Sequence, residues 1–129
     1  MRGEDVRGME KPHKKLDVWK LAMDLVIKLY KVTANFPKEE RFSLTDQIRR
    51  SAVSIPSNIA EGAARNTKRE FVNFLHMAQG SLSELDTQIE LAGRLGYLSE
   101  ADYQKLELLM ERINRMLTGL IRHQRSTYD

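Results

Sequence analysis

Arg69 and His76 are the residues of this 129-residue sequence whose types and spacing come nearest to a catalytic pair. On a helix, this spacing places both side chains on one face, about 10 Å apart along the axis. Some helical ribonucleases pair an arginine with a histidine in this way. Those enzymes usually have Asn, Asp or His directly after the arginine, whereas Glu70 follows here and favours a helix cap. We therefore interpret the pair as an exposed arginine and a surface or interface histidine, and we predict that the protein is not an enzyme.

Metal and cofactor sites have little support in the sequence. A di-iron helical bundle needs a Glu-x-x-His motif on each of two facing helices. Only Glu10 and His13 have this spacing, and Pro12 lies between them. The sequence has no glycine-rich phosphate-binding loop and no cysteine, which excludes disulfide scaffolds, thiol catalysis and cysteine-ligated zinc. We predict neither a metal nor a cofactor.

Charge is distributed unevenly along the chain, although the net charge is only +3. Residues 41–69 and 112–129 carry net charges of +4 and +3, whereas residues 70–111 carry −6. The basic segments could bind phosphates, meet acidic surfaces of other subunits in a ring, or solvate helix faces. Because aromatic residues do not alternate with the basic ones, we expect phosphate-led binding with little sequence preference. The candidate nucleic-acid-binding residues are Arg49, Arg50, Arg65, Lys68, Arg69, Arg112, Arg115, Arg122 and Arg125.

Apolar periodicity predicts four helices that position these side chains. Their expected bounds are residues 17–35, 43–64, 67–95 and 99–125. In the last two helices the apolar spacing is close to a heptad, as in antiparallel bundles. Ser43, Thr67 and Ser99 are the predicted N-caps, because each is followed three residues later by a carboxylate. Gly96 is predicted to end the third helix, so that the third and fourth helices are antiparallel neighbours.

The predicted second helix carries a polar stripe beside its apolar one. Pro56 lies inside this helix and is expected to kink it, because proline removes one helical hydrogen bond. We favour a packing or assembly network for the stripe over an exposed face or a ligand site. If Glu61 is buried, it should pair with Arg49, Arg50 or Arg65. The stripe consists of Ser51, Ser54, Asn58, Glu61 and Arg65.

The sequence predicts an all-α fold, an antiparallel up-down four-helix bundle, over residues 16–126. Residues 1–15 are polar and aperiodic, and we interpret them as a flexible N-terminal arm; residues 127–129 form a C-terminal tail. No apolar run approaches the ~18 residues that a membrane span needs. The first residues lack the apolar core of a secretory signal. We expect a cytoplasmic protein without membrane association.

Residues 47–62, with the sequence QIRRSAVSIPSNIAEG, resemble the signature of the bacterial 23S rRNA intervening-sequence proteins. Residues 79–88 and 94–98 resemble the third helix and following turn of that family, and residues 17–20 resemble the start of its first helix. The similarity spans about residues 14–122. It assigns Gln47, Ser51, Ser54, Asn58, Glu61 and Gly62 to the family motif, with a part in assembly.

The resemblance implies an up-down bundle that assembles as a homopentamer and has no assigned catalytic activity. A more distant relative is the accessory protein of diversity-generating retroelements, which works with a reverse transcriptase and nucleic acid. Our leading hypothesis is a non-enzymatic, ring-forming protein whose multivalent basic patches bind structured RNA, other nucleic acid or a nucleic-acid-processing protein. The alternative is a structural or protein-interaction module whose charges serve homo-oligomer assembly only. The third hypothesis is that the protein is a ribonuclease.

Overall fold

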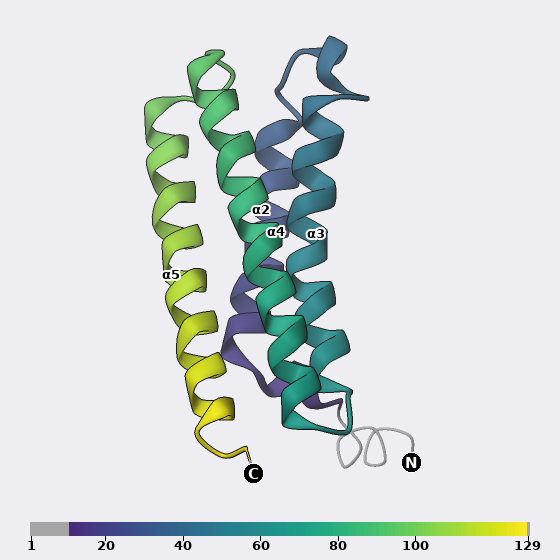
Figure 1. Ribbon diagram of the computed structural model, residues 1–129. Coiled ribbons are helices and arrows are strands. Elements are labelled where there is room, and N and C mark those ends of the chain that lie inside the picture. The colour runs from purple at the N-terminus through teal and green to yellow at the C-terminus, as the bar shows by residue number, and fades with distance from the viewer. Residues whose placement is uncertain (1–10, 129) are drawn as a thin grey trace, which may run out of the picture.

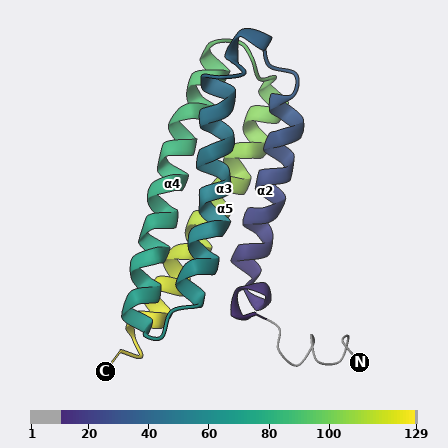
Figure 2. The ribbon, with the colours of Figure 1, turned by 90° about the vertical axis from the view of Figure 1, so that its right-hand side faces the viewer.

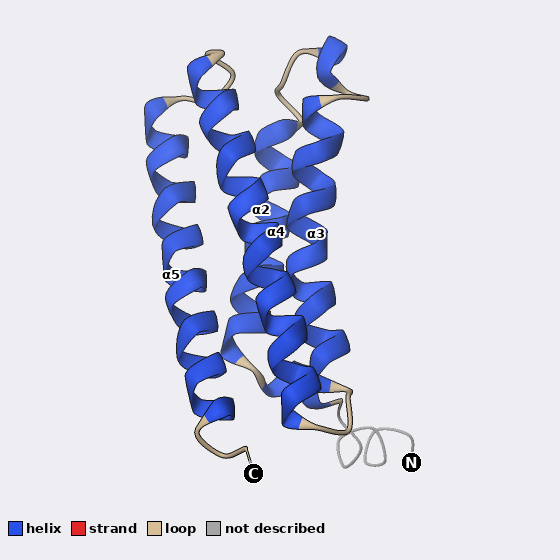
Figure 3. Ribbon diagram, in the orientation of Figure 1, coloured by secondary structure: helices blue, strands red, loops and turns tan. Residues whose placement is uncertain are grey.

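Apolar residues at helical spacing fold this chain into four long helices, as the computed structural model, which describes residues 11–128, shows (Figure 1). In chain order the elements are η1 (Pro12–Lys15), α2 (Asp17–Thr33), η2 (Lys38–Glu40), α3 (Leu44–Ala63), α4 (Lys68–Arg94) and α5 (Glu100–Arg125). The η elements are short 3-10 helices, and the described residues contain no strand (Figure 3). The sequence-based bounds of the four α-helices agree within two residues, and the predicted all-α four-helix bundle is confirmed.

The helices run up and down in sequence order around one core. Contacts join α2 to α3, α3 to α4, α4 to α5, and α5 back to α2, so the bundle is closed. The α2–α3 and α4–α5 connections lie at one end (Figures 1 and 2). The α3–α4 connection, η1 and the last turn of α5 lie at the other. We call this second end the basic end, after its residues Arg65, Lys68, Arg69, Arg122 and Arg125.

Each α-helix contributes large apolar side chains that are fully shielded from solvent. Because these recur every three or four residues, each helix buries one face and exposes the other. Burying one Leu or Ile side chain contributes about 1.5–3 kcal/mol. No helix within residues 11–128 is long and apolar enough to cross a membrane. The largest fully buried side chains are Leu25, Leu29, Ile48, Ile55, Ile59, Leu75, Leu85, Ile89, Leu106, Ile113 and Leu117.

The α3–α4 pair makes the most extensive contact in the bundle, and a glycine makes its close approach possible. A Cβ atom placed on Gly62 would lie 2.6 Å from the Cβ atom of Phe74 and 3.0 Å from Cδ1 of Phe71. Only a residue without a side chain fits there. Pro56, which was expected to kink α3, is buried within a helix that continues uninterrupted from Leu44 to Ala63.

Ser43, Thr67 and Ser99 occupy the predicted N-cap positions, and two of the three make the expected capping hydrogen bond. The side-chain oxygens of Thr67 and Ser99 accept hydrogen bonds, each 3.1 Å long, from the backbone N–H groups three residues later. Such caps satisfy helix donors that have no partner within the helix.

Ser43 is the N-cap residue of α3, as predicted, but its side chain makes no capping hydrogen bond, because a carboxylate from the preceding turn takes this role. The Ser43 hydroxyl donates to Oε1 of Glu40 at 2.6 Å, and the same oxygen accepts from the backbone N–H of Leu44 at 3.3 Å. Tyr97 donates to the other oxygen of Glu40 at 2.8 Å. The bond from Ser43, then that from Tyr97, lower the pKa of Glu40. Glu40 thereby ties the start of α3 to the α4–α5 connection.

The segment directly before α2 contains a short helix. Pro12–Lys15 forms η1, which contacts α2 and α3, and the His13 ring lies edge-on to Trp19 with 4.9 Å between ring centroids. The last four residues of the arm expected over residues 1–15 form this short helix, and the flexibility of the arm stays a prediction. Residues 1–10 of that prediction lie outside the described residues.

Candidate nucleic-acid interface

The turn between α3 and α4 and the last turn of α5 bring basic side chains together at the basic end. Arg65 lies in the connection and Lys68 begins α4, while Arg122 and Arg125 lie in the last turn of α5. The connection and the end of α5 lie at the same end of the bundle (Figure 1). Nζ of Lys68 donates to Oγ1 of Thr127 at 2.7 Å, which ties the connection to the residues after α5. Five of the nine predicted nucleic-acid-binding residues, drawn from two segments far apart in sequence, thus share one end of the bundle.

Two of these arginines stack on aromatic side chains, and the sequence did not reveal these contacts. The Arg69 guanidinium lies 4.6 Å from the ring centroid of Tyr128, and that of Arg65 lies 4.7 Å from the ring of Phe74. Such cation–π contacts orient a guanidinium and leave its N–H groups free to donate, and Arg65 uses one of them to pair with Glu61. A cavity of about 320 Å³ opens beside the first pair, lined by Thr67, Lys68, Arg69, Thr127 and Tyr128.

A second cavity, of about 420 Å³, lies between α4 and α5. Its residues His76, Gln79, Thr118, Ile121, Arg122 and Arg125 form what we call the α4–α5 basic groove. Nε2 of Gln79 crosses the groove and donates to Oγ1 of Thr118 at 3.0 Å and to Oδ1 of Asn114 at 3.2 Å. Within residues 11–128, no carboxylate forms an ion pair with Arg122 or Arg125.

Arg49 lies away from the basic end and joins two helices. Its Nε donates to Oγ1 of Thr33 at 2.9 Å, and its Nη2 donates to the carbonyl oxygen of Tyr30 at 3.2 Å. The guanidinium also lies 4.4 Å from the Tyr30 ring centroid. These contacts fix α3 against α2 and leave Arg49 with a packing role.

The other three predicted residues are exposed on helix surfaces. Arg50 pairs with Asp46 at 2.8 Å near the start of α3, and Arg115 pairs with Glu111 at 3.6 Å on α5. Arg112 also lies on the exposed face of α5. Exposed i,i+4 pairs of this kind contribute about 0.3–0.5 kcal/mol each. The structure therefore does not join these three to the basic end.

The polar stripe of α3 bonds mainly to its own helix. Ser51 is buried, and its carbonyl oxygen accepts from the Ser54 hydroxyl at 2.8 Å; the Asn58 amide donates to the carbonyl oxygen of Ser54 at 2.9 Å. Glu61 is exposed and pairs with Arg65 at 2.9 Å. Of the other motif residues, Gln47 is exposed and Gly62 packs against α4. Gly62 of the motif therefore serves α3–α4 packing, whereas Gln47 and Glu61 remain on the surface.

An acidic groove occupies the opposite half of the α4–α5 face. It has a volume of about 500 Å³, and its charged residues are Asp86, Glu107 and Glu111. Burial, and then the neighbouring carboxyl group of Asp86, raise the pKa of Glu107. We call this cavity the acidic groove; Leu82, Ser83, Thr87, Leu108, Met110 and Asn114 complete its lining.

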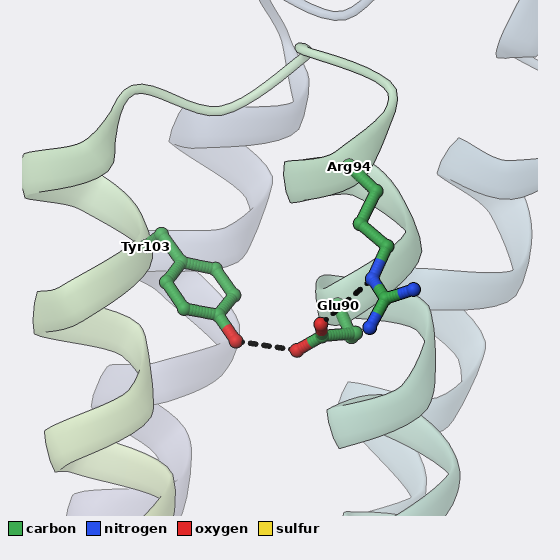
Figure 4. Close-up of polar contacts among 3 residues, drawn as sticks. All are labelled: Glu90, Arg94 and Tyr103. Carbon is green, nitrogen blue, oxygen red and sulfur yellow. Dashed lines mark hydrogen bonds and ion pairs between the residues drawn. The ribbon is translucent and has the colours of Figure 1, made fainter.

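A hydrogen-bonded triad links α4 and α5 near their connection (Figure 4). The Tyr103 hydroxyl donates to Oε1 of Glu90 at 2.5 Å, and Nε of Arg94 donates to Oε2 at 2.9 Å. The bond to Glu90, with burial, raises the pKa of Tyr103 to about 12. The bonds from Tyr103 and Arg94 lower the pKa of Glu90. The triad is a structural clamp at the end opposite to the basic one.

The residues first considered for catalysis are held by different partners. Arg69 stacks on Tyr128, whereas His76 lines the α4–α5 basic groove with Arg122 and Arg125. The part of the chain that the structure describes contains no cluster of histidine and carboxylate side chains able to hold a metal ion.

An up-down four-helix bundle with a basic end is the class of protein that this fold and site define. The chain belongs to the 23S rRNA-intervening sequence protein family, because the sequence model of that family matches residues 14–119. It is also similar to a solved structure from Bacteroides thetaiotaomicron, a protein of unknown function from the S23 ribosomal protein family. The two share 26% sequence identity and a TM-score of 0.73 over 81% of this chain and 97% of that chain. No curated protein matches. The resemblance found in the sequence is confirmed.

Proposed function

We propose that this chain is a non-enzymatic binding protein whose basic end contacts the phosphates of structured RNA or another nucleic acid. The observation that carries the proposal is the convergence of Arg65, Lys68, Arg69, Arg122 and Arg125 on one end of the bundle. Lysine and arginine side chains that neutralise phosphates release counterions, and this supplies affinity without sequence preference.

The arrangement of the basic end supports a surface for polyanions. Arg69 and Arg65 are oriented by aromatic rings, and Arg122 and Arg125 have no carboxylate partner within residues 11–128. A net charge of +3 is modest for one copy. Assembly as a homopentamer, which we include in the proposal, repeats each basic end and raises the overall affinity through multivalency.

The test is binding of labelled structured RNA and of a matched DNA duplex across about 50–300 mM salt. We expect affinity to fall steeply with rising salt. The variant Arg122→Glu/Arg125→Glu should bind more weakly, with a salt slope lower by about two, since each phosphate contact contributes about one. Binding that does not depend on salt, or no binding at the lowest salt, would overturn the proposal.

A matched control separates the basic end from net charge. Arg50→Glu/Arg112→Glu changes the total charge by the same amount at positions away from the basic end. We expect this variant to keep most of its affinity. Equal losses of nucleic-acid affinity in the two double variants would contradict the assignment of binding to the basic end.

A second candidate function is assembly alone, and one observation favours it. The α4–α5 face carries the acidic groove on one half and the α4–α5 basic groove on the other. Copies of the chain could therefore meet through opposite charges, as head-to-tail contacts in a ring require. In that case Arg122→Glu/Arg125→Glu would dissociate the oligomer, whereas under the first proposal the oligomer stays intact and only nucleic-acid binding is lost.

A further inference from the structure

We propose that the α4–α5 basic groove binds one unstacked nucleotide, with the base against Ile121 and the phosphate at Arg122 and Arg125. This inference rests on the proposed function, because it assigns a nucleotide subsite within the basic end. It goes beyond that function because it adds contact with a base. Phosphates can be bound on an open surface, whereas a single unstacked base is bound in a cavity.

The groove has the dimensions and lining of a site for a small organic anion. Its volume of about 420 Å³ falls within the range of ligand pockets, which are mostly apolar with a few placed polar groups. Ile121 is only 6% exposed and forms an apolar floor. A nucleobase has an apolar face and polar edges, and both match these walls.

Gln79 provides a polar group with a fixed orientation. Its Nε2 is committed to Asn114 and Thr118, which orients the side-chain amide. No hydrogen bond within residues 11–128 uses its Oε1 atom. A carbonyl oxygen held in this way can accept a hydrogen bond from an exocyclic amino group, as found on adenine or cytosine.

The rim of the groove supplies the charge. Arg122 and Arg125 are exposed and carry forked guanidinium groups, which pair bidentately with phosphate or stack on bases. His76 adds an imidazole donor on the α4 side. The next turns toward the α4 start carry Lys68 and Arg69, in position to contact phosphates of neighbouring nucleotides. The ligand chemistry is therefore a nucleoside monophosphate unit, in an unpaired strand or free.

The experiment compares two oligomers of equal length and charge by fluorescence anisotropy: an oligoadenylate and the matching abasic ribose-phosphate strand. We expect the oligoadenylate to bind at least about tenfold more tightly, because only this strand offers a base for apolar contact with Ile121 and a hydrogen bond to Gln79. Adenosine 5′-monophosphate is the third ligand. Weaker binding of this mononucleotide than of the oligoadenylate assigns the groove to a strand, and the reverse order assigns it to a free nucleotide.

Thr118→Leu is the informative variant, because it fills the groove without changing charge. Thr118 is exposed, so the bundle should fold normally. We expect the preference for oligoadenylate over the abasic strand to fall at least about fivefold, since the base loses its contacts in the filled groove. Thr87→Leu is the matched control, an exposed α4 threonine in the acidic groove. It should retain the preference.

The outcomes separate the two proposals. Equal binding of the oligoadenylate and the abasic strand, or an unchanged preference in Thr118→Leu, overturns the nucleotide subsite and leaves the proposed function standing. Failure of the duplex and of both strands to bind at low salt overturns the proposed function and the subsite together. If the protein prefers the oligoadenylate over the abasic strand but does not bind the duplex, only the broader phosphate-binding surface is overturned.

Discussion

Gly62 determines how closely α4 approaches α3. A methyl group at this position would lie 2.6 Å from the Cβ atom of Phe74, a neighbour that cannot rotate away. We expect Gly62→Ala to lower the free energy of unfolding by about 1–3 kcal/mol, the usual cost of overpacking. Urea denaturation followed by circular dichroism measures this change.

The matched control is Gly80→Ala on the exposed face of α4. Apart from the neighbouring residues and the backbone of its own helix, no atom lies within 4 Å of a Cβ built there, so only the helix propensity changes. This substitution should raise the free energy of unfolding by about 0.5–1 kcal/mol. A similar effect of the two substitutions would show that Gly62 is not a point of close packing.

The bond between Tyr103 and Glu90 predicts how stability depends on pH. The pKa of Tyr103 is raised to about 12. The contribution of its hydrogen bond to the free energy of unfolding is therefore complete below the ordinary tyrosine pKa and is lost as the pH rises toward 12. The pKa of Glu90 is lowered. The stabilisation of the fold by its carboxylate is therefore present above the ordinary glutamate pKa and is lost as the pH falls through the lowered pKa. Tyr103→Phe should therefore lower the Tm near neutral pH.

Spectrophotometric titration of tyrosinate provides the direct measurement. The wild-type protein should show a tyrosine that ionises near pH 12, and Tyr103→Phe should lack this step. Tyr97→Phe is the comparison, because Glu40 raises the pKa of Tyr97 as well. A titration curve unchanged by Tyr103→Phe would contradict the assigned bond.

At the scale of elements, Arg49 holds the α2–α3 pair together. The side chain of one helix bonds to Thr33 and to the Tyr30 carbonyl of the other. We expect Arg49→Ala to destabilise the protein by about 1–2 kcal/mol, since bonds from a charged donor are lost and part of the packing with them. Arg50→Ala, which removes only an exposed pair, should change stability by less than about 0.5 kcal/mol in thermal or chemical unfolding.

Helices and their neighbours could be predicted from the sequence because local rules determine them. Periodicity located all four helices, and the short turn at Gly96 correctly made α4 and α5 antiparallel. The same turn explains which residues face one another. Pairs such as Glu90 with Tyr103 and Gln79 with Asn114 lie at nearly equal distances along the chain on either side of Gly96. The groove residues His76 and Gln79 could have been found from this register.

Contacts that depend on an irregular segment or on a distant one could not be predicted in the same way. Ser43 has the local signal of an N-cap, but the nearby residue Glu40, placed by η2, accepts from the backbone N–H of Leu44 instead. Arg49 looks like any exposed basic residue until α2 presents a carbonyl oxygen and a ring to it. Tyr128 is far from Arg69 along the chain, so its place beneath that guanidinium depends on the whole bundle.

At the scale of the whole molecule, charge is divided along the α4–α5 face. The acidic groove lies toward the α4–α5 connection, and the α4–α5 basic groove lies toward the basic end. This division is compatible with nucleic-acid binding, because the basic end can bind phosphates while the acidic half repels them. It is equally compatible with assembly, because the acidic half of one copy can attract the basic half of another. The oligomeric mass of charge-reversed variants distinguishes these uses.

Charge reversal of each half, alone and together, is the decisive set of variants. Asp86→Lys/Glu111→Lys makes the acidic groove basic, and Arg122→Glu/Arg125→Glu makes the basic groove acidic. We expect light scattering to give the wild-type mass for all three chains, because the proposed function places phosphates, not a second copy, on Arg122 and Arg125. Electrostatic assembly requires a different pattern. Each single reversal would then set like charges against each other and dissociate the protein, while the combined variant, with both signs exchanged, would restore attraction and the wild-type mass.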